Sequence, residues 1–294
     1  MELSAVREVS IAVNLTHRFI YLVPEAAQEA AAVGLADSGP AGPAYFAFRS
    51  AAMGTVPWQV VLASFYNWHA RAVQPMSGVW DVASPGRWQA ARFRAACRAL
   101  QRVGVDLTPG NIAEARSLID PVVAGADYAG KPLAAANASV ALPSDPLTAL
   151  WQQITVLREW RGDAHITVLA GNCLGPCECN VIHTATGRFP TAVARATRGW
   201  SDEEWTAASA RLAARGWLDA DGRVTDTGAA AREQVEVETD QHCAGLWEPI
   251  GNEGARRLAS LIAKIDDAFT TAGTYSQFHG TPPTSEPRPQ RRLE

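Results

Sequence analysis

Residues 200–225 constrain the fold more than any other part of this chain. Ser201 is a good N-cap and Glu204 stands three residues later, so the pair forms the capping box that opens a helix. The amphipathic pattern that follows predicts a helix ending at Gly216. Polar and apolar residues then alternate around Asp221-Gly222, which is typical of a tight β-hairpin.

Helical segments are expected before this hairpin. Apolar residues recur at helical spacing over 147–160, and a polar run follows over 158–165. Asp163 in that run is a candidate N-cap for a second helical segment. A Gly-Pro break and a short further helix then lead to the helix over 201–216. Three helices followed by a hairpin define a winged helix, and we expect one over residues 145–272.

The first half of the chain echoes this pattern in a weaker form. Ser84 is an N-cap with Trp88 four residues on, just as Trp205 follows Ser201, and a helix is expected over 85–103. We interpret the echo as a degenerate tandem repeat whose first copy has lost its wing. The predicted fold is therefore mainly α, with two tandem divergent winged-helix units, the first degenerate and the second with a β-hairpin wing.

This interpretation divides the chain into four parts. Residues 1–107 form the degenerate helical unit, 108–144 the linker helices, and 145–272 the winged-helix unit with its C-terminal helices. Residues 273–294 form a tail that is disordered by composition. Two related units would pack as a pseudo-dimer with a crevice between them, which is a usual place for a ligand.

Several short motifs carry a resemblance to known proteins. Residues 218–228 resemble the wing and wing exit of MarR-type regulators, where a Thr followed by a Gly starts the next helix. Up to about Gly273, the chain resembles a tandem helix-turn-helix family of high-GC Gram-positive bacteria, through motifs at 14–21, 65–67, 157–163 and 197–201. The resemblance implies a helix-turn-helix fold and no particular activity, because a fold does not fix a function.

The charge balance weighs against general affinity for nucleic acid. The net charge is −4 and the pI is near 5.9, whereas DNA affinity comes largely from cationic side chains. The helix that would read bases begins with Asp202, Glu203 and Glu204, which would face phosphates. A DNA-binding transcriptional regulator of MarR type is therefore the alternative hypothesis, reading DNA through 201–215 and 221–223. Six arginines support it: Arg188, Arg195, Arg198, Arg211, Arg215 and Arg223.

The sequence also limits the cellular setting and the reaction classes. No apolar run is long enough to span a membrane, and the N-terminus lacks the features of a signal peptide. We therefore expect a cytoplasmic protein with no membrane partner, as a monomer or a homodimer. There is no Gly-rich phosphate loop, Gly-x-Ser-x-Gly elbow or His-Glu-x-x-His helix, so nucleotide-dependent, serine-hydrolase and zincin chemistries are unsupported.

The chain has five cysteines, which is an odd number, and we expect it to be cytoplasmic. Both points favour free thiols or metal ligands over disulfides. Cys173, Cys177 and Cys179 lie close together in the sequence. A helix starting at Pro176 would put Cys179 and His183 one turn apart, a spacing able to hold a soft metal. The predicted metal ligands are Cys177, Cys179 and His183, and the alternative is that these small side chains pack in a helical turn.

Four of the six histidines lie beside the motifs that carry the resemblance, namely His17, His69, His165 and His183. Brought together in the crevice, these imidazoles could hold a transition metal or a haem, or act as acid and base, since His titrates near neutral pH. The alternative for each single His is a structural role, as a helix cap or in a polar gap.

The leading hypothesis is a small-molecule or metal- or haem-binding winged-helix protein with a His-lined pocket between the two units. A sensor, a carrier and an enzyme of specialised metabolism all remain open. Arg158 can present its planar fork to a carboxylate or phosphate, whereas pairing of Arg158 or Arg161 with Glu159 is the architectural alternative. The candidate catalytic residues are His165 and His183, and the candidate ligand contacts are His17, His69, Tyr66, Asn67 and Arg158.

Overall fold

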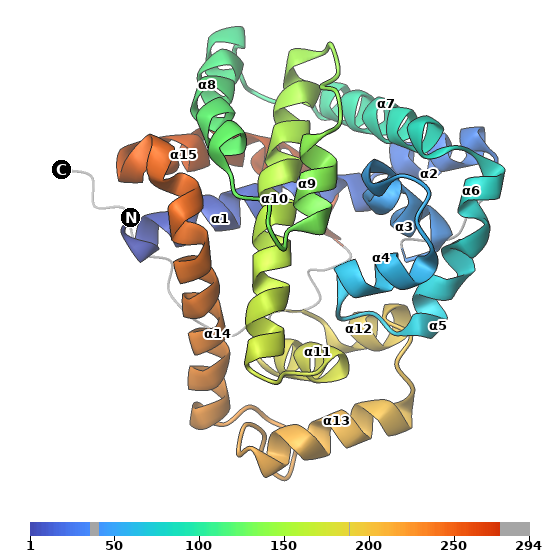
Figure 1. Ribbon diagram of the computed structural model, residues 1–294, viewed down its shortest axis with the longest axis vertical. Helices are drawn as coiled ribbons and strands as arrows, with labels where there is room; N and C mark the ends of the chain where they lie inside the picture. Colours follow the sequence, from blue (N-terminus) through green and yellow to red (C-terminus); the bar gives the residue numbers. More distant parts are fainter. Residues whose placement is uncertain (36–40, 188, 277–294) are drawn as a thin grey trace.

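The computed structural model describes residues 1–35, 41–187 and 189–276, and within these ranges the chain is built from helices (Figure 1). In order they are α1 (Leu3–His17), η1 (Arg18–Tyr21), α2 (Pro24–Val33), α3 (Pro43–Ser50), η2 (Ala51–Met53), α4 (Trp58–Phe65), α5 (Ala70–Val73), η3 (Gln74–Gly78), α6 (Val79–Val82), α7 (Pro85–Val103), α8 (Pro109–Gly125), α9 (Pro132–Ala138), α10 (Pro146–Gly171), α11 (Pro176–Ala185), α12 (Thr191–Thr197), α13 (Asp202–Ala214), α14 (Asp226–Ala244), η4 (Gly245–Ile250) and α15 (Gly251–Thr271).

Local signals explain where many of these helices begin and end. α2, α3 and α7 to α11 have a proline in the first turn, where its missing N–H is not needed. Ser84 caps α7 as predicted, and the left-handed Gly104 ends it. The capping box of Ser201 and Glu204 at the start of α13 is confirmed. These helix limits follow from short stretches of sequence alone.

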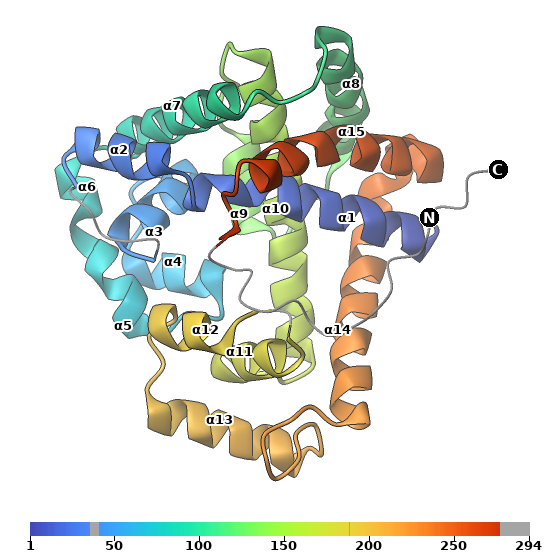
Figure 2. The same ribbon diagram turned by 180° about the vertical axis from the view of Figure 1, so that it is seen from behind.

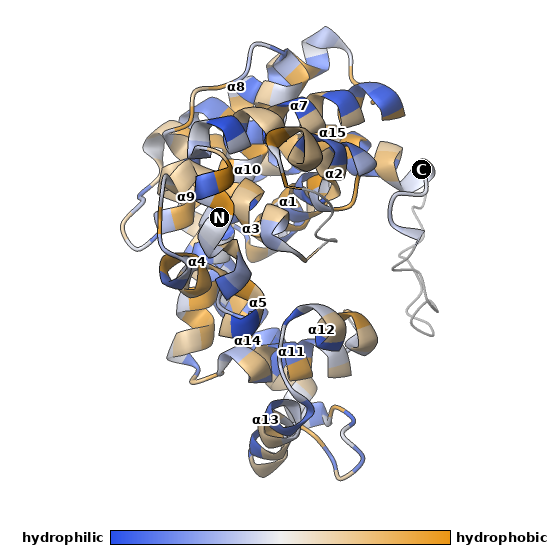
Figure 3. Cartoon of the chain, turned by 90° about the vertical axis from the view of Figure 1, so that its right-hand side faces the viewer, coloured by the Kyte–Doolittle hydropathy of each residue, from blue (hydrophilic) through white to orange (hydrophobic). Residues whose placement is uncertain are grey.

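The long helix α10 runs through the centre of the molecule, and the other helices pack around it (Figure 1). α1 and α15 lie side by side across it (Figure 2). The ring of Phe19 in η1 stacks on that of Phe269 in α15 at a centroid distance of 4.1 Å. A second apolar cluster lies among α2 to α7. A third joins the end of α10 to α11, α12 and α13, which lie at the lower end of the molecule (Figure 3).

The predicted helix start at Asp163 is wrong, because α10 continues without a break through this polar run. Helices pack on several sides of α10, so polar residues in its interior are buried and find partners on other helices. Asp163 still caps a helix, but a different one: its carboxylate accepts the backbone N–H groups of Leu133 and Ala134 at the start of α9, at 3.1 and 3.0 Å.

The predicted β-hairpin wing is also wrong. Between α13 and α14 the chain makes one isolated antiparallel bridge, Leu218 to Val224, and the described residues contain no strand. A side chain closes the turn, since the Asp219 carboxylate accepts hydrogen bonds from the backbone N–H groups of Asp221 and Arg223 at 2.9 and 2.8 Å. These contacts hold the segment as a tight turn without a ladder beyond the single bridge.

The prediction of two tandem winged-helix units is wrong as well, because the second unit has no wing; the mainly α part of the prediction agrees with the structure. The described residues form three apolar clusters where two equivalent halves would give two. The repeat rested on a cap followed by a Trp, but Trp88 lies in the second cluster and Trp205 in the third. Helix caps are local features that unrelated helices share, so two similar caps do not indicate that the two halves of the chain have the same tertiary fold.

The structure tests the predicted domain boundaries and the predicted tail only in part. The expected tail from 273 lies, from residue 277 on, outside the described residues. The boundaries at 107, 144 and 272 stay predictions. None of the helices in the described ranges combines the length and the apolar character needed to cross a membrane.

Candidate functional site

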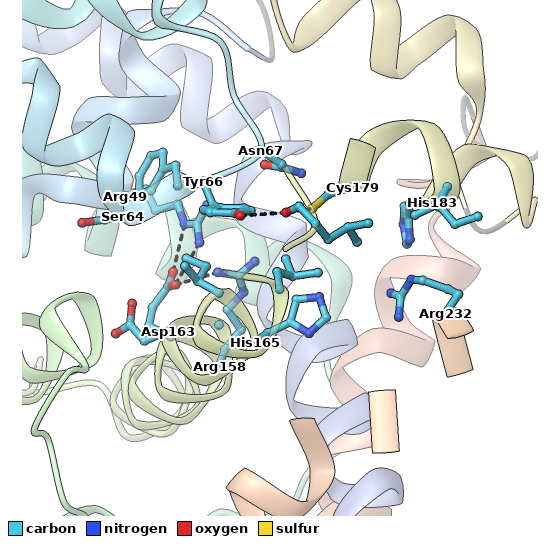
Figure 4. Close-up of a pocket in the computed structure, with 17 residues that line it drawn as sticks. Arg49, Ser64, Tyr66, Asn67, Arg158, Asp163, His165, Cys179, His183 and Arg232 are labelled. Atoms are coloured by element: carbon cyan, nitrogen blue, oxygen red, sulfur yellow. Dashed lines mark hydrogen bonds and ion pairs between the residues drawn. The ribbon is translucent and has the colours of Figure 1, made fainter. Parts of the chain in front are cut away.

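A pocket lies where α10 meets α11, α14 and the linker between α4 and α5 (Figure 4). Its volume is about 200 Å³. His183 and Arg232 lie toward one end of the view, and Ser64, Arg49 and Asp163 toward the other. The lining residues are Arg49, Ser64, Phe65, Tyr66, Asn67, Arg158, Glu159, Gly162, Asp163, His165, Ile166, Leu169, Leu174, Cys179, Ile182, His183 and Arg232.

A buried ion cluster forms one wall of the pocket. The Glu159 carboxylate on α10 accepts two hydrogen bonds from Arg49 on α3, at 3.0 and 2.9 Å, and a third from Arg158 at 2.6 Å. Burial alone would raise the pKa of Glu159, but the guanidiniums of Arg158 and Arg49 hold that pKa well below its usual range. Two cations therefore share one carboxylate, and the cluster carries a positive charge.

Asp163 lies one turn further along α10, on the same wall. Burial raises the pKa of Asp163 to about 6, and the charge of Glu159 adds to the increase, although its hydrogen bonds from α9 oppose it. The two peptide N–H groups that donate to the Asp163 carboxylate are buried. Asp163 therefore joins α9 to α10 at the edge of the pocket.

Replacing Asp163 with Ala is expected to lower the free energy of unfolding by about 1–3 kcal/mol, because two buried N–H groups lose their acceptor. Asp163→Asn keeps an acceptor oxygen and is the matched control. The folded protein holds the Asp163 proton up to about pH 6, whereas the unfolded chain releases it near 3.8. The wild type should therefore lose stability relative to Asp163→Asn as the pH rises through this window. Urea titrations at several pH values measure both effects, and equal stability of the Ala and Asn variants would contradict the capping role.

His165 contributes a hydrogen-bond acceptor to the pocket. Its Nδ1 lies 2.8 Å from the hydroxyl oxygen of Thr239, and that hydroxyl donates to the Val235 carbonyl at 2.7 Å. The Thr239 oxygen must therefore accept from Nδ1–H. Burial lowers the pKa of His165 to about 3, so the ring is neutral and Nε2 carries a lone pair. Nε2 has no hydrogen-bond partner among the residues that the structure describes.

Arg232 on α14 brings a third guanidinium to the pocket. Its Nη2 donates to Glu236 at 2.5 Å, and Arg161 donates to the same carboxylate at 2.7 Å. Burial alone would raise the pKa of Glu236, but these two guanidiniums hold that pKa well below its usual range. The Nη1 atom of Arg232 is buried and has no hydrogen-bond partner within the described part of the chain. One N–H group of a buried cation is thus left without an acceptor.

A strained turn forms the opposite side of the pocket. Tyr66 has φ 45° and ψ −65°, and the Asn67 N–H donates to the Phe65 carbonyl at 2.7 Å, which together make a γ-turn of the rare hand. The Tyr66 hydroxyl donates to the Leu174 carbonyl at 2.7 Å (Figure 4). The Asn180 amide on α11 donates to the Asn67 carbonyl, also at 2.7 Å. The turn is therefore tied to the segment that begins α11.

The comparisons with known proteins bear on the arrangement of α11, α12 and α13. A family model described as a helix-turn-helix family matches residues 6–276, which is nearly the whole chain. The chain belongs to this helix-turn-helix family. No curated protein and no solved structure matches it. The helix-turn-helix part of the sequence resemblance is confirmed, while the MarR type and the bacterial group stay predictions.

In this helix-turn-helix protein the four predicted pocket histidines do not meet. His165 and His183 line the pocket. His17 lies elsewhere, fully buried between the hydroxyls of Thr155 and Tyr21 at 3.1 and 2.8 Å, and burial lowers its pKa. His69 caps α5 by accepting the N–H of Arg71 and pairs with Glu204 on α13. His17 and His69 therefore have the structural roles that were the alternative for each histidine.

The cysteines of α11 also differ from the metal-site prediction. The Cys177 thiol donates to the Glu204 carbonyl, whereas the Cys179 thiol donates to the Leu174 carbonyl, so the two face different neighbours. Burial raises the pKa of Cys177 to about 11 and that of Cys179 to about 12, which keeps both as neutral thiols. No group of three or more His, Cys, Asp or Glu side chains in the described ranges is placed to hold a metal ion. The predicted set of Cys177, Cys179 and His183 finds no support.

The outward face of α13 is mostly small and uncharged, with Thr206, Ala207, Ala210 and Ala213 exposed. Asp202 and Glu203 are exposed at its first turn. Most of the predicted arginines already have partners: Arg195 with Asp202, Arg211 with Glu178, Arg223 with Asp221, Arg215 with the carbonyls of Asn172 and Cys173, and Arg198 stacked 4.1 Å from the Trp68 ring centre. Arg188 lies outside the described residues.

Sequence reasoning missed two pocket arginines, Arg49 and Arg232. Arg49 pairs with a carboxylate 110 residues away, and no local pattern around it signals that contact. Arg232 lies on α14 four residues before Glu236, so the sequence shows the ion pair but not the pocket that it faces. Both residues can be recognised as part of the pocket only from the tertiary packing.

Proposed function

We propose that this helix-turn-helix protein is a DNA-binding transcriptional regulator that contacts DNA through α13 and the turn 217–225. The observation that carries the proposal is membership of the helix-turn-helix family over residues 6–276. In that motif the second helix commonly enters the major groove. Small outward residues such as Thr206, Ala207 and Ala210 suit close approach to base edges, including apolar contact with thymine methyl groups.

The charge distribution supports a contact with the DNA backbone at one end of α13. Arg211, Arg215 and Arg223 are exposed at its C-terminal end and in the turn, whereas Asp202 and Glu203 occupy the first turn. The Arg223–Asp221 pair is exposed on both sides, and such surface ion pairs contribute only about 0–1 kcal/mol, so Arg223 can exchange its present partner for a phosphate. The C-terminal half of α13 is therefore the part expected to lie against DNA.

Replacing Arg211, Arg215 and Arg223 together with Gln is expected to weaken duplex binding and to lower the salt slope by about 2–3, at roughly 0.9 per lost phosphate contact. The matched control replaces Arg256, Arg257 and Lys264 with Gln, because these exposed cations lie on α15, far from the helix-turn-helix segment in sequence and packing. Fluorescence anisotropy with mixed-sequence duplexes over a salt series measures both. An absence of binding by the wild type at low salt would remove this function.

The pocket supports a second candidate function, which is binding of a small molecule. The observation that favours it is the pocket lined by three arginines, in which one N–H group of the buried Arg232 has no acceptor among the residues that the structure describes. Five residues named from the sequence as catalytic or ligand-binding lie together there: Tyr66, Asn67, Arg158, His165 and His183.

The two functions are compatible in one molecule. The pocket is lined by Cys179, Ile182 and His183 of α11, and α11 packs directly on α13. A ligand held between α10 and α11 would bias the position of the helix-turn-helix segment only by binding one arrangement more tightly than another. The proposal is therefore a regulator whose DNA contact responds to a bound small molecule.

A further inference from the structure

The pocket has the charge expected of a site for an anion. Arg49, Arg158 and Arg232 line it, against the carboxyl groups of Glu159 and Asp163. Arg49 is fully engaged with Glu159 and Tyr45, so it is not available to a ligand without breaking that pair. Arg158 is partly exposed and makes one bond to the shared carboxylate. Among the lining residues, three guanidiniums therefore face two carboxyl groups, which leaves an excess of positive charge.

Arg232 supplies the more specific feature. Its side chain is 7% exposed, and Nη1 is buried without a hydrogen-bond partner within the ranges that the structure covers. Buried polar groups in native proteins are normally paired, and an unpaired one calls for an explanation such as a missing ligand. A carboxylate oxygen at this point would accept a charge-assisted hydrogen bond from Nη1.

His165 adds a requirement of the opposite kind. Its Nδ1–H is committed to Thr239, so its Nε2 can only accept a hydrogen bond. A bare carboxylate has no proton to donate there, whereas a hydroxyl group does. His165 and Arg232 both line this pocket of about 200 Å³, so a single small ligand can contact both.

The rest of the lining is apolar. Phe65, Ile166, Leu169 and Ile182 contribute hydrocarbon surface. A second, mostly apolar hollow of about 410 Å³ shares Ser64, Asp163 and Ile166 with the pocket and runs between α4, α10 and the start of α9. An aliphatic chain can therefore lie against the pocket wall and extend toward this hollow.

We propose that the pocket binds a small aliphatic 2-hydroxycarboxylate, whose carboxylate accepts from Arg232 Nη1 and whose hydroxyl donates to His165 Nε2. The inference rests on the second candidate function, the small-molecule pocket, and gives it a ligand class. Arg158 adds positive charge to the same wall, and the hydrocarbon part lies along Ile166 and Leu169.

Three probes of similar shape test this on the full chain by calorimetry: 2-hydroxy-4-methylpentanoate, 4-methylpentanoate and 4-methylpentan-1-ol. The hydroxy acid is expected to bind most tightly, the plain acid about tenfold more weakly for the loss of one hydrogen bond, and the alcohol below detection. Arg232→Gln should weaken the hydroxy acid by about tenfold or more. His165→Phe should remove the preference for the hydroxy acid over the plain acid.

Arg161→Gln is the matched control. Arg161 pairs with the same Glu236 as Arg232 does, but it does not line the pocket, so its loss should leave the affinity unchanged. If Arg232→Gln does not fold, Arg158→Gln tests the surplus charge instead, because it leaves the Arg49–Glu159 pair in place. Arg158→Gln should weaken both acids.

The outcomes separate this inference from the pocket itself. Equal binding of the alcohol and the acids overturns the anion assignment and leaves a small-molecule pocket. No binding of any probe overturns both the ligand class and the pocket function. Unchanged affinity in Arg232→Gln, or a loss in Arg161→Gln as large as in Arg232→Gln, overturns the role given to Arg232.

Discussion

Replacing Glu159 with Gln is expected to lower the free energy of unfolding by about 3–5 kcal/mol, the range seen when one partner of a buried ion cluster is removed. Glu159 is 1% exposed and is the shared acceptor of Arg49 and Arg158. Arg158 is 23% exposed and can turn toward solvent, but Arg49 is 9% exposed and would stay buried without a counter-ion. Most of the loss should therefore come from Arg49.

A double variant tests that assignment. Arg49→Met combined with Glu159→Gln removes both buried charges while Met keeps apolar volume against the Phe65 ring, which lies 4.2 Å from the Arg49 guanidinium. The double variant should recover much of the stability lost in Glu159→Gln, because a buried pair is often replaceable by apolar groups. Urea unfolding of the four proteins in the cycle gives the coupling. A control at the exposed Glu114–Arg257 pair, Glu114→Gln, should change little. Additive losses in the cycle would contradict the paired role.

The same cluster shows why the fold was only partly predictable. Helix limits came from neighbouring residues, such as Ser84 and Gly104 around α7. The partners of the polar run in α10 come from far along the chain: Arg49 for Glu159 and the start of α9 for Asp163. When those partners are unknown, the sequence pattern of the polar run predicts an end to the helix. With them it is compatible with a continuous helix, and α10 passes straight through.

The candidate site was predictable to a similar degree. Tyr66, Asn67, Arg158, His165 and His183 were named from short motifs, and the structure brings them to one pocket. The two histidines that lie elsewhere, His17 and His69, belong to equally distinctive motifs but serve as a buried bridge and a helix cap. A motif shows that a residue is specified, while its role depends on which partners the fold supplies.

The prediction of a β-hairpin wing was wrong because of contacts made by one side chain, Asp219, and one glycine, Gly228. Asp219 captures two N–H groups of its own turn, which closes the segment without a strand pair. Gly228, which the resemblance to MarR-type regulators singled out after Thr227, sits in the first turn of α14 directly against this segment. The sequence identified the right residues there but not the geometry that they produce.

Gly228→Ala is expected to detach the turn 217–225 from α14 and to lower stability by about 3 kcal/mol, the upper end of the usual cost of overpacking. A Cβ at Gly228 would lie 2.1 Å from the Trp217 carbonyl oxygen and 2.8 Å from its carbonyl carbon. Both atoms are backbone, and the same oxygen accepts the Thr225 N–H at 3.0 Å, so neither side can yield without breaking the α14 cap.

The matched control is Gly245→Ala at the end of the same helix. Gly245 has an ordinary φ of −61°, and a Cβ there would meet nothing within 4 Å. This variant should be neutral or stabilised by up to about 1 kcal/mol. Denaturant unfolding and hydrogen exchange at the amides of Asp219 and Thr225, which bond within the turn, distinguish the two. Exchange in Gly228→Ala as slow as in the wild type would mean that the close approach of Gly228 to Trp217 does not hold this turn. Because the turn carries Arg223, faster exchange there should coincide with weaker DNA binding if the segment is the DNA contact.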